Sequence, residues 1–160
     1  MSPLLVTLTA LAGLGCAVLG GVFVAFSTLV MKALGRVPAR QGIVAMQAIN
    51  RAALTPAFMV LFLGTTLLCA LLTGWSFLLW GSGSALLLLT GGVSCLVGAF
   101  GVTAGYHVPR NNALDTLDPS GTEAVARWTS YQRGWTRWNH VRACASLAAA
   151  VLFTVALVLR

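Results

Sequence analysis

The chain has 160 residues, of which 58% are hydrophobic and only 8% are charged, and its mean hydropathy is +0.89. Soluble domains carry about 25% charged residues, so the composition excludes a soluble protein and predicts one integral membrane domain over residues 1–160. The net charge of +7 would suit nucleic-acid binding, but the basic residues gather in two segments between apolar runs, which is typical of cytoplasmic loops. We therefore expect the lipid bilayer, and no nucleic acid, as the partner.

The first apolar run, residues 4–31, is predicted to be a retained membrane span. It is too long for the apolar region of a signal peptide, about 7–15 residues, and no basic segment precedes it. Small residues recur at every fourth position, which lets another helix approach closely. The stripe serves packing within the chain and contact between two copies equally well, so a homo-oligomer is left open. Its members are Gly13, Ala17, Gly21 and Ala25.

An amphipathic helix is predicted over residues 38–54, where Pro38 suits the first helical position. Thr55 and Pro56 then indicate either the cap and first turn of a new helix or a kink within one long helix, and the sequence leaves both open. The polar face of the amphipathic segment follows i, i+3, i+4 spacing. It consists of Gln47, Asn50 and Arg51.

Spans two and three are predicted at residues 57–80 and 85–106, joined as an antiparallel hairpin by the uncharged turn 81–84. Pro109 disfavours helix at the residue before it, so we expect the chain to break near the membrane surface.

Beyond this point the sequence predicts a loop and then a long final helix. Ser120 and Glu123 match a capping box, which predicts a helix from about Gly121 into span four at residues 143–159. The stretch before span four is rich in aromatic and polar residues. At 100° per residue, one face of it gathers a polar and aromatic set, and Arg133, Arg137 and His140 fall on the opposite face. The gathered set is Trp128, Tyr131, Trp135, Trp138, Asn139 and Arg142.

Four spans place both termini on one side of the membrane and the two basic loops, residues 32–55 and 106–142, on the other. The positive-inside rule makes the loop side cytoplasmic and the termini extracytoplasmic, in a multi-pass protein of the cell membrane. The predicted fold class is all-α: an integral membrane four-helix bundle with amphipathic cytoplasmic helical extensions before spans two and four. Polar groups of the two loops can then meet at one cytoplasmic mouth.

Metal and cofactor sites are not predicted. His107 and His140 could ligate a metal with Asp115 or Asp118, but they show no metal-binding spacing. No phosphate loop, haem-attachment motif or nucleophile elbow is present. Three cysteines fall near mid-bilayer without CxxC spacing, which favours small apolar fillers over a thiolate metal site. They are Cys16, Cys69 and Cys95.

Four ordered motifs resemble those of the anthrone-oxygenase-like family of small membrane proteins. They lie at Phe23–Met31, Ala45–Arg51, Val108–Asn112 and Trp135–Arg142, and the resemblance covers about residues 10–158. It implies a four-helix membrane protein and, from characterised fungal relatives, oxidation of an anthrone to an anthraquinone with O₂. Most bacterial members have no assigned function. The asparagine usual before the Val-Pro pair is His107 here, which is a departure from the family pattern.

The resemblance also implies roles for the residues that match. An anthrone methylene is acidic enough for a base to deprotonate, and the carbanion can react with O₂ without metal or flavin. His140 or His107 is the candidate base, although His140 projects away from Arg142 on an ideal helix. The candidate oxyanion donors are Asn111, Asn139 and Arg142. The remaining candidate substrate-binding residues are Gln47, Asn50, Arg51, Asn112, Trp135 and Trp138, of which the two tryptophans could stack on the substrate.

Two other classes of function stay open at this stage. The same polar groups could pin helices together in a non-catalytic membrane scaffold that binds a partner or lipid. A small transporter is the other alternative, although the absence of a carboxylate within any predicted span argues against proton coupling.

Overall fold

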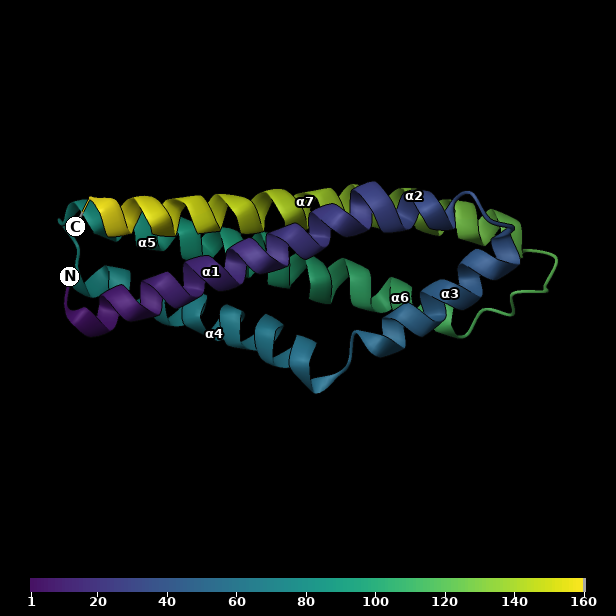
Figure 1. Ribbon diagram of the computed structural model, residues 1–160, viewed down its shortest axis with the longest axis horizontal. Helices are drawn as coiled ribbons and strands as arrows, with labels where there is room; N and C mark the ends of the chain where they lie inside the picture. The colour runs from purple at the N-terminus through teal and green to yellow at the C-terminus, as the bar shows by residue number, and fades with distance from the viewer. Residues whose placement is uncertain (160) are drawn as a thin grey trace.

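The computed structural model describes residues 1–159, and within this range it is built of helices and turns (Figure 1). The elements are α1 (Pro3–Ala25), the π-helical segment η1 (Phe26–Val30), α2 (Met31–Leu34), α3 (Ala39–Ala52), α4 (Pro56–Leu78), α5 (Gly83–Val93), the π-helical segments η2 (Ser94–Gly101) and η3 (Thr103–His107), α6 (Val108–Asp115) and α7 (Ala124–Val158).

These elements form four antiparallel helical segments, which we call legs, and the chain runs up, down, up and down through the bundle. α1, η1 and α2 make one continuous helix, α3 and α4 make the second leg, α5 to α6 make the third, and α7 is the fourth. α1 packs against α7 and α4, and α5 packs against α4 and α7, so neighbouring legs are antiparallel. The chain start, the α4–α5 turn and the end of α7 share one end of the bundle. The loops 35–38 and 116–123 share the other, which we name the basic end.

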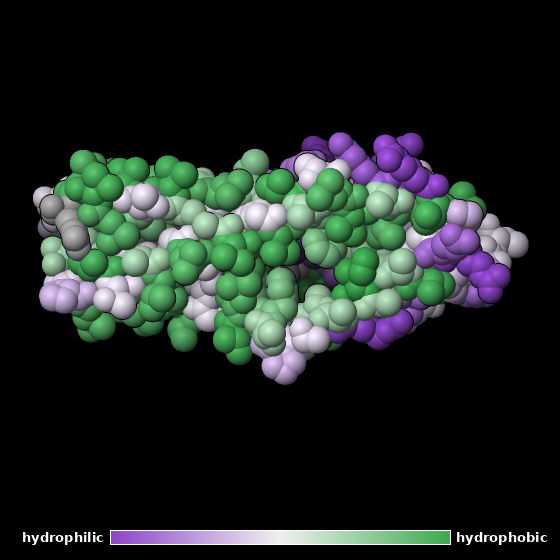
Figure 2. Space-filling model, in the orientation of Figure 1, coloured by the Kyte–Doolittle hydropathy of each residue, from purple (hydrophilic) through white to green (hydrophobic). Residues whose placement is uncertain are grey.

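Four helices in residues 1–159 are long and apolar enough to cross a membrane: Pro3–Leu34, Pro56–Leu78, Gly83–Asp115 and Ala124–Val158. Their outward surfaces carry exposed leucine, valine and phenylalanine side chains, whereas hydrophilic residues collect toward the basic end (Figure 2). A large exposed apolar surface of this kind suits a lipid environment. The chain is an all-α, multi-pass membrane bundle, as the composition predicts.

Residues 38–80 form two helices and not one kinked helix. α3 ends at Ala52, α4 begins at Pro56, and Thr55 has the extended backbone of an N-cap residue. α3 is amphipathic, with Ile43 and Met46 buried against α7 and α6 and Arg51 exposed. α3 and the first turns of α7 therefore are the two amphipathic extensions predicted before spans two and four.

The expected break at Pro109 is wrong. Val108 keeps a right-handed helical backbone, and the third leg runs without interruption to Asp115. The N–H of Val108 donates to the carbonyl of Thr103, five residues earlier, so the helix is locally widened just before the proline. Membrane helices tolerate proline where such π-type adjustments redistribute the backbone hydrogen bonds.

The predicted capping box is also wrong. α7 starts at Ala124, and Glu123 makes an ion pair with Arg127 at 2.8 Å. Ser120 instead donates from its backbone N–H and its hydroxyl to the carboxylate of Asp118, both at 2.9 Å. These hydrogen bonds hold the pKa of Asp118 below its usual range. The final helix itself is confirmed, and it continues as one element through the aromatic stretch to Val158.

The bundle core depends on close helix contacts at a few glycines. A side chain at Gly98 on η2 would overlap the methyl group of Ala145 on α7, whereas Gly64 on α4 has open space at the same position. The closest approach of the third and fourth legs therefore requires a residue without a side chain at position 98.

We expect Gly98→Ala to lower the thermal unfolding midpoint in detergent, because overpacking costs about 1–3 kcal/mol. Gly64→Ala is the matched control and should leave the midpoint unchanged or raise it, since alanine favours helix. Equal midpoints for the two variants would contradict the close packing of these legs.

Candidate functional site

A cavity of about 350 Å³ lies where the second leg is interrupted between α3 and α4. All four legs contribute to its wall, and Figure 2 shows a hollow between the apolar part of the bundle and the basic end. The volume falls within the range of about 300–1,000 Å³ that is typical of small-molecule sites. Its apolar lining includes Val22, Phe23, Phe26, Met46, Ile49, Phe58, Met59, Phe62 and Trp135, and its polar lining is Asn50, Thr103, His107, Asn111 and Arg142.

Arg142 is a buried polar residue of the wall, held by neighbours from three legs. Its Nη1 donates to Thr103 Oγ1 at 3.1 Å, and its Nη2 donates to Asn139 Oδ1 at 2.6 Å. The guanidinium carbon lies 4.3 Å from the ring centre of Phe23 and 5.2 Å from that of Trp135, close enough for cation–π attraction. The arginine is thus fixed in place without a carboxylate.

Asn139 fixes the arginine to the first leg. It is fully buried, and its Nδ2 donates to the backbone carbonyl of Phe23 and to Ser27 Oγ, both at 2.6 Å. Ser27 belongs to η1, where the helix is π-helical. The amide oxygen of Asn139 therefore positions Arg142, and its amide nitrogen links α7 to α1. Asn139 does not line the cavity.

Arg142 is only 7% exposed and makes no ion pair within residues 1–159. The sequence has three acidic residues, and they serve other groups: Asp115 pairs with Arg51, Glu123 pairs with Arg127, and Asp118 accepts from Ser120. A buried cation without a counter-charge is costly. The Nε of Arg142 also has no hydrogen-bond partner among the described residues, although it is buried. The cavity wall therefore contains one positive charge that no acidic side chain of the described residues neutralises.

His107 lines the same cavity on η3 and is 1% exposed. Its Nδ1 lies 3.4 Å from the carbonyl oxygen of Val102, and its Nε2 lies 3.3 Å from that of Trp135. A neutral imidazole can donate to only one of these oxygens, whereas the protonated ring can donate to both. The two carbonyls would thus accept both N–H groups after His107 takes up a proton.

Asparagines form the cavity wall nearer the basic end. Asn111 Oδ1 accepts from Tyr131 at 2.9 Å and from Trp135 Nε1 at 3.2 Å, which ties α6 to α7. Asn50 on α3 also lines the cavity, and its buried Nδ2 has no partner among the described residues. Asn50 is therefore a second residue of the cavity wall with a buried donor that lacks a partner.

The remaining predicted site residues lie elsewhere. His140 and Asn112 are exposed and do not line the cavity, because each occupies the outer face of its helix. His140 is therefore unsuited to act as the base, in keeping with its position opposite Arg142 on the helix. Trp138 is 40% exposed and packs on Tyr106, with ring centres 5.1 Å apart, so it does not stack in the cavity.

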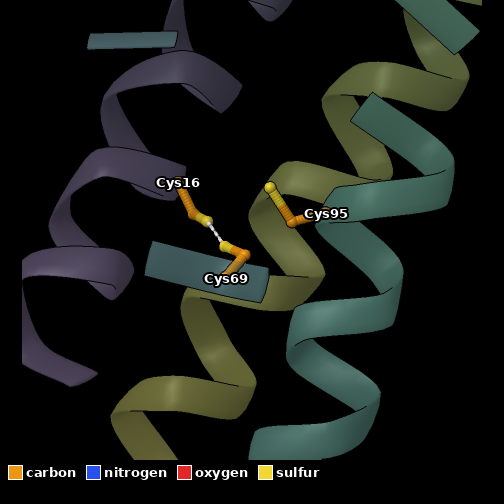
Figure 3. A group of neighbouring side chains, drawn as sticks. All are labelled: Cys16, Cys69 and Cys95. Atoms are coloured by element: carbon orange, nitrogen blue, oxygen red, sulfur yellow. Dashed lines mark hydrogen bonds between the residues drawn. The ribbon is translucent and has the colours of Figure 1, made fainter. Parts of the chain in front are cut away.

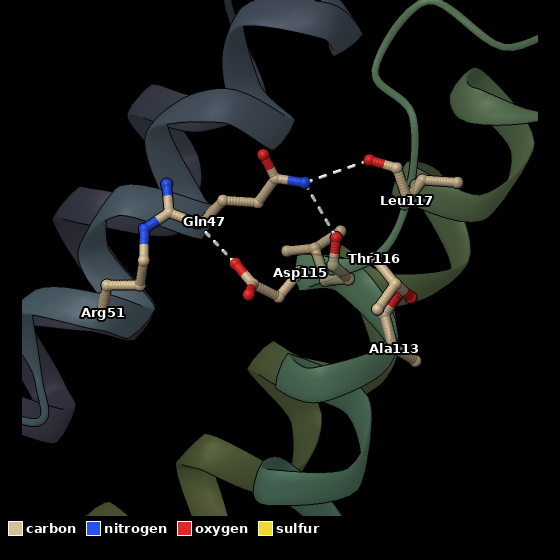
Figure 4. Close-up of polar contacts among 7 residues, drawn as sticks. Gln47, Arg51, Ala113, Asp115, Thr116 and Leu117 are labelled. Carbon is tan, nitrogen blue, oxygen red and sulfur yellow. Dashed lines mark hydrogen bonds and ion pairs between the residues drawn. The ribbon is translucent and has the colours of Figure 1, made fainter.

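Gln47 and Arg51 do not belong to the cavity lining, and Figure 4 shows their contacts with Asp115 and Leu117. Gln47 Nε2 donates to the carbonyls of Leu114 at 2.9 Å and Leu117 at 3.1 Å. Arg51 pairs with Asp115 at 2.6 Å on the surface. The contacts attach α3 to the end of α6 and to the following loop, so this part of the predicted polar face is structural.

Sequence reasoning missed several residues of the site. Thr103 supports Arg142, and Phe58, Phe62 and Met59 form much of the apolar wall. A threonine or phenylalanine in a membrane span carries no signal that separates it from ordinary packing residues. The aromatic and polar residues at the end of span one were a clearer sign of the site than the residues of span two. Phe23 and Phe26 line the cavity, and Ser27 accepts a hydrogen bond from Asn139.

Comparison with known proteins identifies the family of the chain. The family model described as anthrone oxygenase matches residues 58–152, more than half of the chain. The chain belongs to the anthrone oxygenase family. The matched part includes Thr103, His107 and Arg142 of the cavity wall, while α1 and α3 lie before it. No curated protein and no solved structure matches the chain.

The Asn139 network is expected to stabilise the bundle. Asn139→Ala leaves Ser27 and the Nη2 of Arg142 without their partner in a buried place, which should cost about 1–3 kcal/mol. A lower midpoint of thermal unfolding in detergent would show this. Asn112→Ala, on the exposed face of α6, is the matched control and should unfold like the unmodified protein.

Proposed function

We propose that this protein is a membrane-embedded oxygenase that oxidises a flat, lipophilic, hydroxylated aromatic molecule of the anthrone type with O₂. The observation that carries the proposal is the buried Arg142, which lines a cavity walled by aromatic rings, carries an unneutralised charge and has a buried Nε without a hydrogen-bond partner among the described residues. Such a site suits a substrate that is apolar over most of its surface and becomes an oxyanion during reaction. Membership of the anthrone oxygenase family supports the same substrate class.

The proposed reaction begins with loss of a proton from the methylene carbon opposite the anthrone carbonyl. The negative charge spreads to the carbonyl oxygen, where Arg142 Nε stabilises it. O₂ adds to the carbanion carbon, and protonation gives a hydroperoxide. The second proton of that carbon then leaves as the O–O bond breaks, which yields the new carbonyl and water. One anthrone and one O₂ give one anthraquinone and one water, and the substrate supplies all the electrons.

The side chains of the cavity divide into three roles in this proposal. His107 takes up the proton, and the carbonyls of Val102 and Trp135 accept its two N–H groups. Asn50 donates to a phenol or carbonyl oxygen of the substrate through its free Nδ2. The aromatic walls, with Trp135 on one side and Phe58 and Phe62 on another, pack on the substrate rings.

The charge of Arg142 should be essential for turnover. We expect Arg142→Gln to lower kcat of substrate-dependent O₂ uptake by about 10²- to 10³-fold, the usual effect of losing an oxyanion donor. The measurement is O₂ consumption and anthraquinone formation by purified protein with a hydroxylated anthrone, corrected for spontaneous oxidation. Arg137→Gln, on the exposed face of α7, is the matched control and should keep full activity. Equal rates for a folded Arg142→Gln variant and the control would contradict the assignment.

A substitution that fills the cavity should block substrate binding. Ala53 lines the cavity at the α3–α4 turn, whereas the nearby Ala57 is exposed and lies outside the lining. We expect Ala53→Phe to raise KM or abolish activity, and to abolish quenching of tryptophan fluorescence by the anthraquinone product. Ala57→Phe should behave like the unmodified protein. Unchanged binding in Ala53→Phe would place the substrate site elsewhere.

A non-catalytic scaffold is the second candidate function, and the Asn139 contacts favour it. These contacts bind α7 to α1 whether or not a substrate is present. Under this alternative, Asn139→Ala and Arg142→Gln lower stability, and no hydroxylated anthrone is turned over by the folded protein. Substrate-dependent O₂ uptake above the spontaneous rate would exclude it.

A further inference from the structure

Three cysteine side chains from three legs of the bundle meet in its apolar core. Cys16 lies on α1, Cys69 on α4 and Cys95 on η2, and each is at most 1% exposed. The Sγ atoms of Cys16 and Cys69 are 3.6 Å apart, and the three sulfur atoms all lie within 4.8 Å of one another. Figure 3 shows the sulfur atoms of Cys16 and Cys69 facing one another, with Cys95 beside them. The cluster lies outside the cavity lining.

We propose that Cys16, Cys69 and Cys95 bind a single soft, monovalent metal ion, of which Cu(I) is the natural representative. Soft thiol sulfur selects Cu(I) over hard cations. With metal–sulfur bonds of about 2.3 Å, a trigonal three-sulfur site places its sulfur atoms about 4 Å apart. The observed separations are close to this value, so small side-chain rotations complete the site.

The number of ligands and the surroundings both favour a monovalent ion. Closed Zn²⁺ sites almost always have four ligands, and the described residues offer three at this place, without a histidine or carboxylate beside them. A net charge in the apolar core would be costly. When one Cu⁺ displaces one thiol proton, which leaves to the solvent, the ion and the thiolate together carry no net charge, whereas a divalent ion needs a second thiolate for neutrality.

The position of the site separates it from the proposed oxygenase cavity. Cys16 and Phe23 are seven positions apart along their helix, as are Cys69 and Phe62, which corresponds to about 10 Å. The metal site is thus about two helical turns deeper in the membrane part than the aromatic wall. An ion there would link α1, α4 and η2 and stabilise the bundle. The inference does not depend on the proposed function.

Copper content and thermal stability of the same samples test the proposal. The full chain is expressed with added copper, purified anaerobically in detergent and measured for copper, while a copper-free sample is titrated with Ag(I) as a redox-inert probe. We expect one ion per chain, a higher unfolding midpoint after loading, and sulfur as the nearest scatterer in X-ray absorption spectra. Outer-shell partners alone change metal affinity by about 10- to 100-fold, so losing one sulfur ligand should weaken binding by at least that much.

The variants separate a metal site from simple packing. Cys69→Ser and Cys69→Ala should both lose the ion, the second while keeping an apolar core, whereas Cys144→Ser is the control because Cys144 is exposed. Retained binding in a folded Cys69→Ala protein, or loss of binding in Cys144→Ser, would overturn the proposal. It would also be overturned if the unmodified protein bound no ion but lost two hydrogens on exposure to air, which would indicate a redox-formed disulfide between Cys16 and Cys69.

Discussion

The structure depends on a buried positive charge that the chain itself does not neutralise. Arg142 lies in the core of a membrane bundle, where an isolated charge is among the costliest groups to accommodate. Its neighbours reduce this cost with dipoles and rings: Asn139 and Thr103 accept its hydrogen bonds, and Phe23 and Trp135 face the guanidinium. These groups come from three legs, so the contacts around Arg142 hold three of the four legs together.

The same charge gives the cavity its chemical character. Hydrogen bonds from Nη1 and Nη2 hold the arginine in place, while its buried Nε keeps no partner, so the group is pre-organised before any ligand arrives. Donors of this kind do not have to reorient when negative charge develops, which is the physical basis of oxyanion stabilisation in water-poor sites. Under the proposed function, this unneutralised charge would give affinity and selectivity for a transient anion.

Much of the architecture could be read from the sequence because apolar length and basic loops are strong signals in membrane proteins. The four spans, the two amphipathic extensions and the aromatic face of α7 all follow from hydropathy and helical periodicity. Predictions from local sequence rules were wrong at two predicted helix ends. Proline at position 109 does not end the helix, since a π-helical turn precedes it, and Glu123 pairs with Arg127 instead of capping α7.

The site was predictable to the extent that one helix face carries it. Trp135, Asn139 and Arg142 were grouped correctly, because their spacing on α7 fixes a common direction. Which partners they meet depends on the rotation of the other legs, and single-sequence periodicity does not determine that. For this reason Asn50 and Asn111 reach the cavity, while Asn112, Gln47 and Arg51, which looked equivalent, do not.

The interruption between α3 and α4 bears on how a ligand distributes between the lipid and the cavity. The cavity borders this turn, and Leu54 beside it is 70% exposed on the apolar flank of the bundle. Under the proposed function, a lipophilic substrate dissolved among the acyl chains would approach the cavity from this flank without first crossing water. Occupancy of the cavity would then depend on the mole fraction of the substrate in the lipid or micelle. Adding detergent at a constant total substrate concentration would therefore lower the occupancy.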